Sequence, residues 1–293
     1  MPLASLFHKL FQLIPSNNAL LFRFCNKYIN GYRNENNGDM ASNGELFLLR
    51  RILDCIRQDD EFVVFDVGAN VGDWTASLLD IIENQGSLLR KTVYCFEPSL
   101  FAFSSLLANF AKQPIDRDIH FENLGLSNTP GTVTQFINMN GAGTNSFYKR
   151  RTESIGIIYD KSEVVQTTTV DIYCREKGIS HITFLKIDVE GHELAVLQGA
   201  VDMLKRRAID YIQFEYGGCW IDSRNLLQDM YDLITSYNYT IGKILPRGIE
   251  FYEQYDQRLE NFQMANFLVC DPDQTSHFNR VKPWWMMRDA MNF

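Results

Sequence analysis

The chain has 293 residues, with 45% apolar and 22% charged residues and a formal net charge of −8 at pH 7. This composition is typical of a globular protein that can bury a sizeable core. The acidic balance argues against nucleic acid as the main partner, because proteins that bind phosphate backbones usually carry a basic surface. The six cysteines include no CxxC pair and are expected to be reduced, in a cytoplasmic protein.

Residues 1–60 are expected to form helices that decorate the main domain, interrupted by an Asn- and Gly-rich loop, GYRNENNGDMASNGE. The first fifteen residues place apolar side chains at helical spacing, with Lys9 as their one base. Such a helix would lie on a membrane surface, or pack on its own domain or on the second subunit of a homodimer. We favour packing. No run approaches the roughly 18 apolar residues that span a bilayer, so no transmembrane segment is expected.

Strand and helix patterns alternate from residue 61 to about residue 271. Apolar runs rich in β-branched and aromatic residues predict strands at FVVFDV, TVYCFE, IHFENLGLS, GTVTQFI, ITFLKIDV and IDYIQFEY, with YTIGKIL and NFLVC as a closing pair. This alternation implies an α/β fold with a doubly wound, mostly parallel sheet covered on both faces. We expect one domain over residues 61–271 and a tail over residues 272–293.

The stretch FDVGANVGDW lies where the first predicted strand turns into a helix. Gly68 and Gly72 allow a tight turn and a close approach to a ligand, and parallel sheets bind ligands at this edge. The spacing departs from the GxGxxG pattern of dinucleotide sites, and Asp66 and Asp73 would repel a pyrophosphate. S-adenosylmethionine carries an ammonium and a sulfonium and has no phosphate, so it suits these carboxylates better.

Glu97 ends the second predicted strand, in CFEPS, where an acid can accept hydrogen bonds from both hydroxyls of a ribose. NAD sites use an acid in the same place, so Glu97 alone does not distinguish the two cofactors. Asn123 follows the third strand and either reaches the adenine or is a plain turn residue. Together, the glycine turn, Asp66 and Glu97 predict S-adenosylmethionine as the cofactor.

With DVGANVG, FEPS, NLGLS and LKIDVEGHELAVLQGA in this order, residues 40 to 270 resemble the FkbM-type methyltransferases. The resemblance implies the Rossmann-like, seven-stranded sheet of class I methyltransferases, and O-methylation of a hydroxyl, often on a sugar of a glycan or secondary metabolite. It also implies that S-adenosylmethionine is held by Asp66, Gly68, Asn70, Gly72 and Glu97. The chain departs from the family at GTNSFYKR, where Asn145 and Ser146 stand in place of a Ser-Ser-Leu-like element.

The stretch FLKIDVEGHE concentrates charge at a junction between strand and helix. A lysine in a covered central strand is costly unless it is paired, so we expect Lys186 to contact Asp188 or Asp66. Glu193, in the first helical turn, is expected to be structural, because a carboxylate there interacts favourably with the helix dipole.

Methyl transfer to a sugar hydroxyl needs a base that takes the hydroxyl proton. Asp188, Glu190 and His192 stand at the predicted strand end, where the acceptor would lie. Asp188 is the best candidate for the catalytic centre by position and by resemblance. Whether an acid or His192 takes the proton stays open, since the pKa of histidine also suits proton transfer.

Asp188 and Glu215 end neighbouring strands and would hold a hard divalent cation if their carboxylates met. A metal is not favoured, because Glu215 would equally bind a substrate hydroxyl or pair with a base. Trp284 and Trp285 in the tail would stack on a sugar, but docking on the chain's own core or on a dimer partner is the preferred interpretation.

Two other enzyme functions are considered. A nucleic-acid methyltransferase acting on adenine usually carries an Asp/Asn-Pro-Pro-aromatic string where this chain has IDVEG. An NAD-dependent oxidoreductase would need the dinucleotide fingerprint that is broken here. A binding module without catalysis would not need both the cofactor turn and the charged junction. The sequence therefore predicts a methyltransferase with a saccharide or similar hydroxyl-bearing acceptor.

Overall fold

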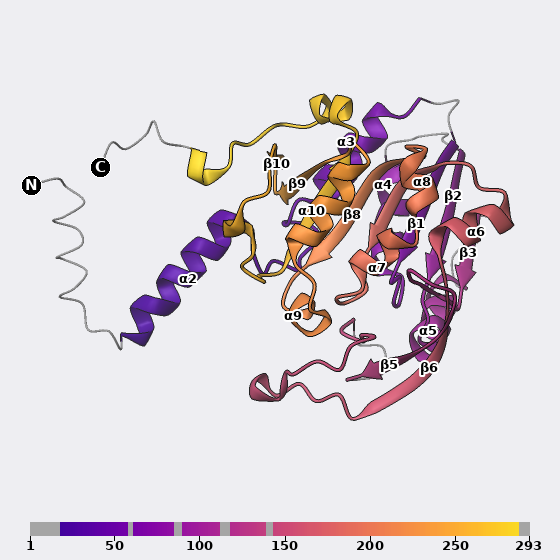
Figure 1. The fold of residues 1–293 in the computed structure, drawn as a ribbon, viewed down its shortest axis with the longest axis horizontal. Helices are drawn as coiled ribbons and strands as arrows, with labels where there is room; N and C mark the ends of the chain where they lie inside the picture. The colour runs from indigo at the N-terminus through magenta and orange to yellow at the C-terminus, as the bar shows by residue number, and fades with distance from the viewer. Residues whose placement is uncertain (1–17, 58–60, 85–89, 112–117, 139–142, 287–293) are drawn as a thin grey trace, which may run out of the picture.

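The computed structural model describes residues 18–57, 61–84, 90–111, 118–138 and 143–286 (Figure 1). Strands alternate with helices along the chain, as the hydrophobic pattern predicts. The main sheet is built from β1 (Glu61–Val67), β2 (Arg90–Phe96), β3 (Ile119–Glu122), β7 (Ile182–Ile187), β8 (Ile209–Tyr216), β9 (Thr240–Leu245), β10 (Gly248–Tyr252) and β11 (Ala265–Cys270). A smaller sheet is built from β4 (Gly125–Leu126), β5 (Gly131–Ile137) and β6 (Lys161–Thr168).

The helices connect these strands and flank the main sheet. In chain order they are α2 (Ala19–Arg33), α3 (Glu45–Cys55), α4 (Asp73–Asn84), α5 (Leu100–Phe110), α6 (Val170–Lys177), α7 (Glu193–Gln198), α8 (Val201–Lys205), α9 (Cys219–Ser223) and α10 (Leu227–Ser236). The described chain also has short 3-10 helices at Glu153–Ile155, Gln257–Leu259, Pro272–His277 and Trp284–Met286.

The main sheet has the order β10-β9-β11-β8-β7-β1-β2-β3, so the described chain forms eight strands rather than the expected seven. From β3 to β8 neighbouring strands are parallel, while β11 runs antiparallel to both β8 and β9. The additional strand is β10, which folds back on β9 in an antiparallel hairpin. Strand β10 pairs with the outer edge of β9 and is itself the edge strand of the main sheet.

Two hydrophobic cores cover the two faces of the main sheet. Alternate residues of a strand point to opposite faces, so Phe65 and Leu185 pack toward α6, α7, α8 and α10, while Val64 and Phe184 pack toward α3, α4 and α5. Figure 1 shows α8 and α10 in front of the sheet. The doubly wound α/β fold that the sequence predicts is therefore confirmed.

The smaller sheet has the order β4-β6-β5, and β5 pairs antiparallel with β6 over its whole length. The sequence predicts β5, as GTVTQFI, but not β6. Strand β4, which follows β3 in the chain, pairs with β6 in parallel through two residue pairs, Gly125 with Thr167 and Leu126 with Thr168. The smaller sheet lies close to the carboxyl ends of the parallel strands. Gln135 of β5 lines the same pocket as residues at those strand ends.

The N-terminal region is helical where it is described. Helix α2 runs through Arg33, three residues into the predicted loop, and the loop to α3 occupies 34–44. The predicted helix over the first fifteen residues lies outside the described residues. At the end of α2, the Arg33 guanidinium donates from Nη1 to both carboxylate oxygens of Glu250, at 3.0 and 2.9 Å, and so fastens the helix to β10.

The C-terminal region docks on the chain's own hairpin. Trp285 stacks on Tyr252, with ring centroids 5.8 Å apart, as the preferred interpretation of the tail expects. All six cysteines are free thiols, of which Cys25 and Cys55 are exposed. Among the described helices, none is long and apolar enough to cross a bilayer.

Candidate functional site

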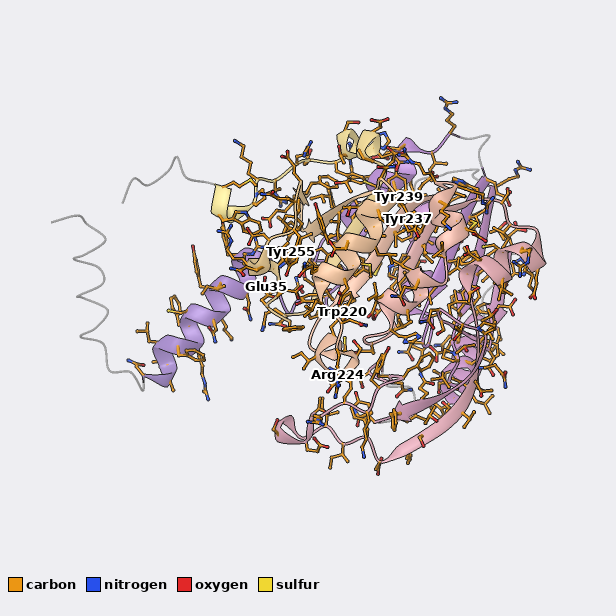
Figure 2. All side chains as sticks on the ribbon, in the orientation of Figure 1. Glu35, Trp220, Arg224, Tyr237, Tyr239 and Tyr255 are labelled. Carbon is orange, nitrogen blue, oxygen red and sulfur yellow. The ribbon has the colours of Figure 1, made fainter. Side chains whose placement is uncertain are left out.

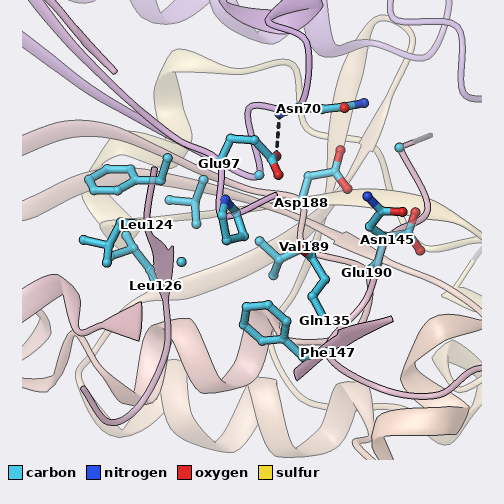
Figure 3. A pocket seen from close by; sticks show the side chains of 16 residues that line it. Asn70, Glu97, Leu124, Leu126, Gln135, Asn145, Phe147, Asp188, Val189 and Glu190 are labelled. Carbon is cyan, nitrogen blue, oxygen red and sulfur yellow. Dashed lines mark hydrogen bonds between the residues drawn. The ribbon is translucent and has the colours of Figure 1, made fainter. Parts of the chain in front are cut away.

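A pocket opens at the carboxyl ends of β1, β2 and β7, where the strand order switches between β1 and β7 (Figure 3). The smaller sheet and the loop after β5 close its other side. One end of the pocket is apolar and the other is acidic. Its lining consists of Val67, Gly68, Asn70, Phe96, Glu97, Pro98, Leu124, Gly125, Leu126, Gln135, Gly143, Asn145, Phe147, Asp188, Val189 and Glu190.

Glu97 is held in place by backbone amides and faces the pocket. Its Oε2 accepts from the Asn70 N–H at 2.9 Å, which Figure 3 marks, and its Oε1 accepts from the Ser99 N–H at 2.9 Å. Burial raises the pKa of Glu97 to about 7, although these two hydrogen bonds oppose the shift. Glu97 is therefore held in one orientation, and each of its oxygens can accept a further hydrogen bond from a ligand.

Gly68 cannot be replaced without moving the strand ends. Its φ is +84°, and a Cβ atom there would lie 1.9 Å from the carbonyl oxygen of Asp188. The ends of β1 and β7 approach this closely because the Asp188 N–H donates to the Val67 carbonyl at 2.9 Å. Glycine is thus required for the backbone to converge at the pocket.

Three residues that the sequence assigns to the cofactor do not line the pocket. Asp66 is fully buried, and its Oδ2 accepts from the Thr75 hydroxyl at 2.6 Å. Gly72 packs against α5, where a Cβ atom would lie 2.5 Å from the Phe110 ring. The Asn123 amide donates to the carbonyls of Glu97 and Pro98, at 2.9 Å each. All three contact other protein groups and lie outside the pocket lining, and their role toward a cofactor stays a prediction.

Lys186 contacts both predicted carboxylates, which confirms that expectation. Its Nζ lies 3.3 Å from Asp188 Oδ2 and 3.5 Å from Asp66 Oδ1, and it also lies 5.6 Å from the centre of the Trp74 ring. Burial alone would lower the pKa of Lys186, but the charges of Asp188 and Asp66 outweigh it and raise the pKa above its usual value. Lys186 is therefore a permanent cation beneath the acidic end of the pocket.

Asp188, Glu190 and Glu215 form an acidic cluster, in which one oxygen from each residue lies within 4.8 Å of the others. Burial, followed by the charge of Asp188, raises the pKa of Glu190 to about 7 and raises that of Glu215 well above its usual value. The structure thus brings together both metal candidates, with Glu190 as a third carboxyl group. Such a cluster can share protons or hold a hard cation.

The turn after β7 presents Glu190 in a strained conformation. Its φ is +55°, unusual for a residue with a side chain. Ser146 donates to its carbonyl at 2.7 Å, and Arg150 Nη1 donates to its Oε2 at 2.7 Å. Strain of this kind persists only where surrounding contacts enforce it, and it is common at functional sites.

Glu193 stabilises the same turn from inside the protein. It is fully buried, and its carboxyl group accepts from the backbone N–H groups of Val189 and Gly191 at 3.0 to 3.1 Å. Burial raises its pKa to about 8 in spite of these bonds. Glu193 is therefore structural, as the sequence suggests, but through hydrogen bonds to the turn that presents Glu190.

His192 lies on the far side of the turn and does not line the pocket. Its Nε2 lies 2.9 Å from the Ser127 hydroxyl, and its Nδ1 lies 2.9 Å from the Tyr148 hydroxyl. Burial lowers the pKa of His192 to about 4, so the ring is neutral at pH 7. The structure thus brings Asp188 and Glu190 to the pocket and places His192 behind them.

Several lining and supporting residues escape the sequence analysis. Gln135 is buried, and its Oε1 has no hydrogen-bond partner among the described residues. Phe147 and Arg150 reach the site from GTNSFYKR, the stretch that departs from the family, although the sequence assigns no role to either residue. Val133, Gln135 and Ile137 alternate along β5 and therefore share one face of the strand, on which Gln135 is the polar residue. A polar residue among apolar ones on such a face is the sequence pattern that would have indicated Gln135. Nothing local marks Arg150.

A family model described as "Methyltransferase FkbM domain" matches residues 66–241 of the chain. The 2-O-methyltransferase NoeI of Sinorhizobium fredii is 24% identical over 211 residues, which cover 69% of this chain and 81% of NoeI. The hexuronic acid methyltransferase AglP of Haloferax volcanii is 26% identical over 162 residues, which cover 55% of this chain and 59% of AglP.

Among solved structures, the crystal structure of Methyltransferase FkbM from Methylobacillus flagellatus is similar, with a TM-score of 0.44 and 16% identity. The similarity covers 73% of this chain and 45% of that one. The chain therefore spans less than two thirds of AglP and less than half of the crystallised FkbM protein.

Proposed function

Because this chain belongs to the FkbM methyltransferase family, we propose that it transfers a methyl group from S-adenosylmethionine to a hydroxyl group of a sugar. The name of the hexuronic acid methyltransferase AglP supports a sugar acceptor, and the name of the 2-O-methyltransferase NoeI supports transfer to an oxygen atom. The observation that carries the proposal is the arrangement of carboxyl groups in the pocket. Glu97 would bind the cofactor, and the separate Asp188 and Glu190 carboxyl groups would bind the acceptor hydroxyl.

The pocket residues fit S-adenosylmethionine better than a dinucleotide. None of the described lining residues is Lys or Arg, so the pocket offers no side-chain cation to a pyrophosphate. Glu97 would accept from the ribose hydroxyls, and Pro98 and Leu124 would flank the adenine. The unpartnered Oε1 of Gln135 is a buried acceptor that the adenine amino group would satisfy.

When bound, S-adenosylmethionine supplies an electrophilic methyl group whose sulfonium leaves as a neutral thioether. The protein must therefore orient the acceptor hydroxyl and take its proton. We assign the proton to Asp188, because 36% of its side chain is exposed and its cation Lys186 lies 3.3 Å away, whereas the Glu190 side chain is 14% exposed and lies 2.7 Å from Arg150. Asp188 would accept the proton that the acceptor hydroxyl loses on methylation, and Lys186 holds that carboxylate in place.

The acidic cluster predicts how the reaction depends on pH. The pKa of Glu190 is about 7, and a proton held by the cluster weakens its ability to accept another. The cluster loses this proton as the pH rises. We therefore expect kcat/KM to be low at pH 6 and to rise through an inflection near pH 7.

The first test is binding, measured by calorimetry with S-adenosylmethionine, S-adenosylhomocysteine and NAD. The proposal expects both sulfur compounds to bind and NAD not to bind, and the opposite pattern would overturn it. Transfer of labelled methyl groups is then measured on hexuronic acids, neutral sugars and oligonucleotides. Methylation of the oligonucleotides but of no sugar would replace the proposal with the nucleic-acid alternative.

The assignment of the base is tested with Asp188→Asn. Loss of a general base typically lowers kcat by about 10²- to 10⁴-fold, while binding of S-adenosylmethionine should change little. Asp202→Asn, at an exposed carboxylate of α8 outside the pocket, is the matched control. If Asp188→Asn keeps full turnover and His192→Asn loses it, then His192 is the base.

A divalent cation is the second candidate for the acidic cluster. Carboxylate oxygens are the preferred ligands of Mg²⁺ and Ca²⁺, and a cation there would lower the pKa of the acceptor hydroxyl. The permanent cations Lys186 and Arg150 already neutralise part of the cluster, so we favour catalysis without a metal. Dialysis against EDTA should then leave turnover unchanged, and loss of turnover that Mg²⁺ restores would establish the metal.

A further inference from the structure

Helix α2 carries a surface of large apolar side chains that nothing in the described chain covers. It projects away from the body of the protein, as Figure 1 shows. Leu20 is 81% exposed, and the other strongly exposed apolar side chains are Phe22, Phe24, Tyr28 and Ile29, at 66%, 69%, 68% and 51%. Monomeric proteins rarely expose contiguous apolar surface of this kind without a partner.

The helix is amphipathic along its whole length. At 100° per residue, Leu20, Phe24 and Tyr28 follow one another along one side, and Cys25, Ile29 and Phe22 continue that side around the helix. The opposite side carries Asn26, Asn30, Arg23 and Lys27. A helix with bulky apolar residues on one side and Arg and Lys on the other matches the pattern of helices that lie in a membrane interface.

The charge of this region is opposite to that of the rest of the chain. The first 34 residues contain four basic side chains and no acidic one, in a chain with a formal net charge of −8. Arg33 is engaged by Glu250, but Arg23 and Lys27 make no ion pair with a described residue. Basic side chains next to an exposed apolar stripe complement an anionic lipid surface, whereas like charges would oppose the pairing of two such helices.

Buried ion pairs and hydrogen bonds hold the C-terminal end of α2 against the hairpin of β9 and β10. Besides Arg33 and Glu250, the Lys243 ammonium lies 2.7 Å from Glu35, and the Asn34 amide donates to the Ile244 carbonyl at 3.1 Å. Figure 2 shows Glu35 where α2 meets the body. A buried network at the end of the helix means that docking of α2 would also set the orientation of the domain.

We propose that α2 docks the protein on an anionic lipid surface, with Phe24 and Tyr28 facing the acyl chains, Leu20 and Ile29 at the two margins of that apolar side, and Arg23 and Lys27 at the phosphate level. The sequence pattern indicates a membrane surface only for the first fifteen residues, where packing is the preferred interpretation. The exposure of α2 is a separate observation, and the docking does not depend on the proposed methyl transfer.

The test is flotation of the full chain with vesicles of phosphatidylcholine alone, or of phosphatidylcholine with a quarter phosphatidylglycerol. Binding is expected only to the anionic vesicles and should weaken in high salt. Arg23→Gln with Lys27→Gln should weaken partitioning by about 25-fold, since each base near an anionic surface contributes roughly fivefold. Leu20→Ser with Phe24→Ser should abolish it.

Leu107→Ser with Val164→Ser is the matched control, because both side chains are exposed, at 42% and 71%, and lie outside α2. This variant should float like the wild type. Circular dichroism and binding of S-adenosylmethionine show that each variant is folded. Absence of flotation of the wild type, or equal binding to both kinds of vesicle, would overturn the proposal.

The chain also provides two positions for a reporter of contact. Cys25 lies on the apolar side of α2 and Cys55 lies at the end of α3, and both thiols are exposed. A nitrobenzoxadiazole group on Cys25, in a Cys55→Ser variant, should shift its emission to the blue with anionic vesicles, whereas the group on Cys55 should not. A shift on Cys25 that depends on protein concentration and needs no lipid would instead identify a second copy as the partner.

Discussion

Replacing Glu97 by glutamine tests the cofactor site with a minimal change of shape. The carboxylate accepts one backbone N–H on each oxygen, from Asn70 and Ser99, at 2.9 Å each. Two carboxylate oxygens can accept about four hydrogen bonds, so two remain for a ligand. Glutamine keeps one oxygen and places an amide NH₂ group against one of the two backbone donors.

The expected losses follow from this count. One backbone N–H left without an acceptor costs about 1 to 3 kcal/mol of folding stability. One charge-assisted hydrogen bond to the ribose contributes about 1.5 to 3 kcal/mol, so the affinity for S-adenosylmethionine should fall roughly 10- to 150-fold. Glu122→Gln is the control, because Glu122 ends the neighbouring strand β3 and binds Tyr173 instead of lining the pocket.

Calorimetry at pH 8 and pH 6 adds a second, sharper readout. The pKa of Glu97 is raised to about 7, so the carboxyl group is ionised at pH 8 and largely protonated at pH 6. The wild type should therefore bind S-adenosylmethionine more weakly at pH 6, while Glu97→Gln should bind with similar affinity at both. Equal affinities of variant and wild type at pH 8 would refute the assigned role of Glu97.

Three further predictions concern the junction of α2 with β10, the glycine turn after β1 and the turn after β7. Glu250→Ala leaves the buried guanidinium of Arg33 without its main partner, so the free energy of unfolding, measured with urea, should fall by about 3 kcal/mol. Gly68→Ala forces β1 away from the Asp188 carbonyl and should abolish binding of S-adenosylmethionine in calorimetry. The pKa of Glu193 is about 8 in the folded protein and near 4.5 in the unfolded chain. Between these two pH values the folded state holds a proton that the unfolded chain releases, so folding loses stability as the pH rises. The free energy of unfolding, measured with urea, should therefore be lower at pH 8.5 than at pH 6.5.

Matched changes separate these effects from general damage. Glu253→Ala removes an exposed acid next to the hairpin and should leave stability within about 0.5 kcal/mol. Gly31→Ala, in α2, has nothing within 4 Å of its new Cβ atom and should be neutral or slightly stabilising. Stability that rises between pH 6.5 and pH 8.5, or that is unchanged by Glu250→Ala, would contradict the reasoning.

The pairing of Lys186 was predictable because it follows from a general cost. A charge in a covered strand must find a partner, and the strands nearest to β7 offered few carboxylates. The register then places Asp66 of β1 directly opposite Lys186. Glu97 was predictable in the same way, since the carboxyl ends of parallel strands share one edge of the sheet.

The positions of His192 and Asn123 could not be read from the chain. Both follow a strand end, where the sequence predicts a place near the ligand, yet each side chain turns toward protein groups. For His192 the reason is the turn, in which Glu190 has a φ of +55° and Gly191 a φ of +102°. These two left-handed residues redirect the chain, so that alternation along the strand no longer tells which way a side chain points.

By itself, the sequence determined the alternating sheet and helices, the glycine turn and the acids at the ends of β1, β2 and β7. These features follow from periodicity and from the cost of burying charge, which act between residues close in the chain. Only the tertiary structure decided that Glu215 joins Asp188, that Arg150 binds Glu190 and that Gln135 faces the pocket with a free acceptor. The first contact depends on the pairing of β7 with β8, and the other two depend on how the loop after β5 and the smaller sheet pack at the strand ends. These contacts join segments far apart in the chain, so the spacing of residues in the sequence does not fix them.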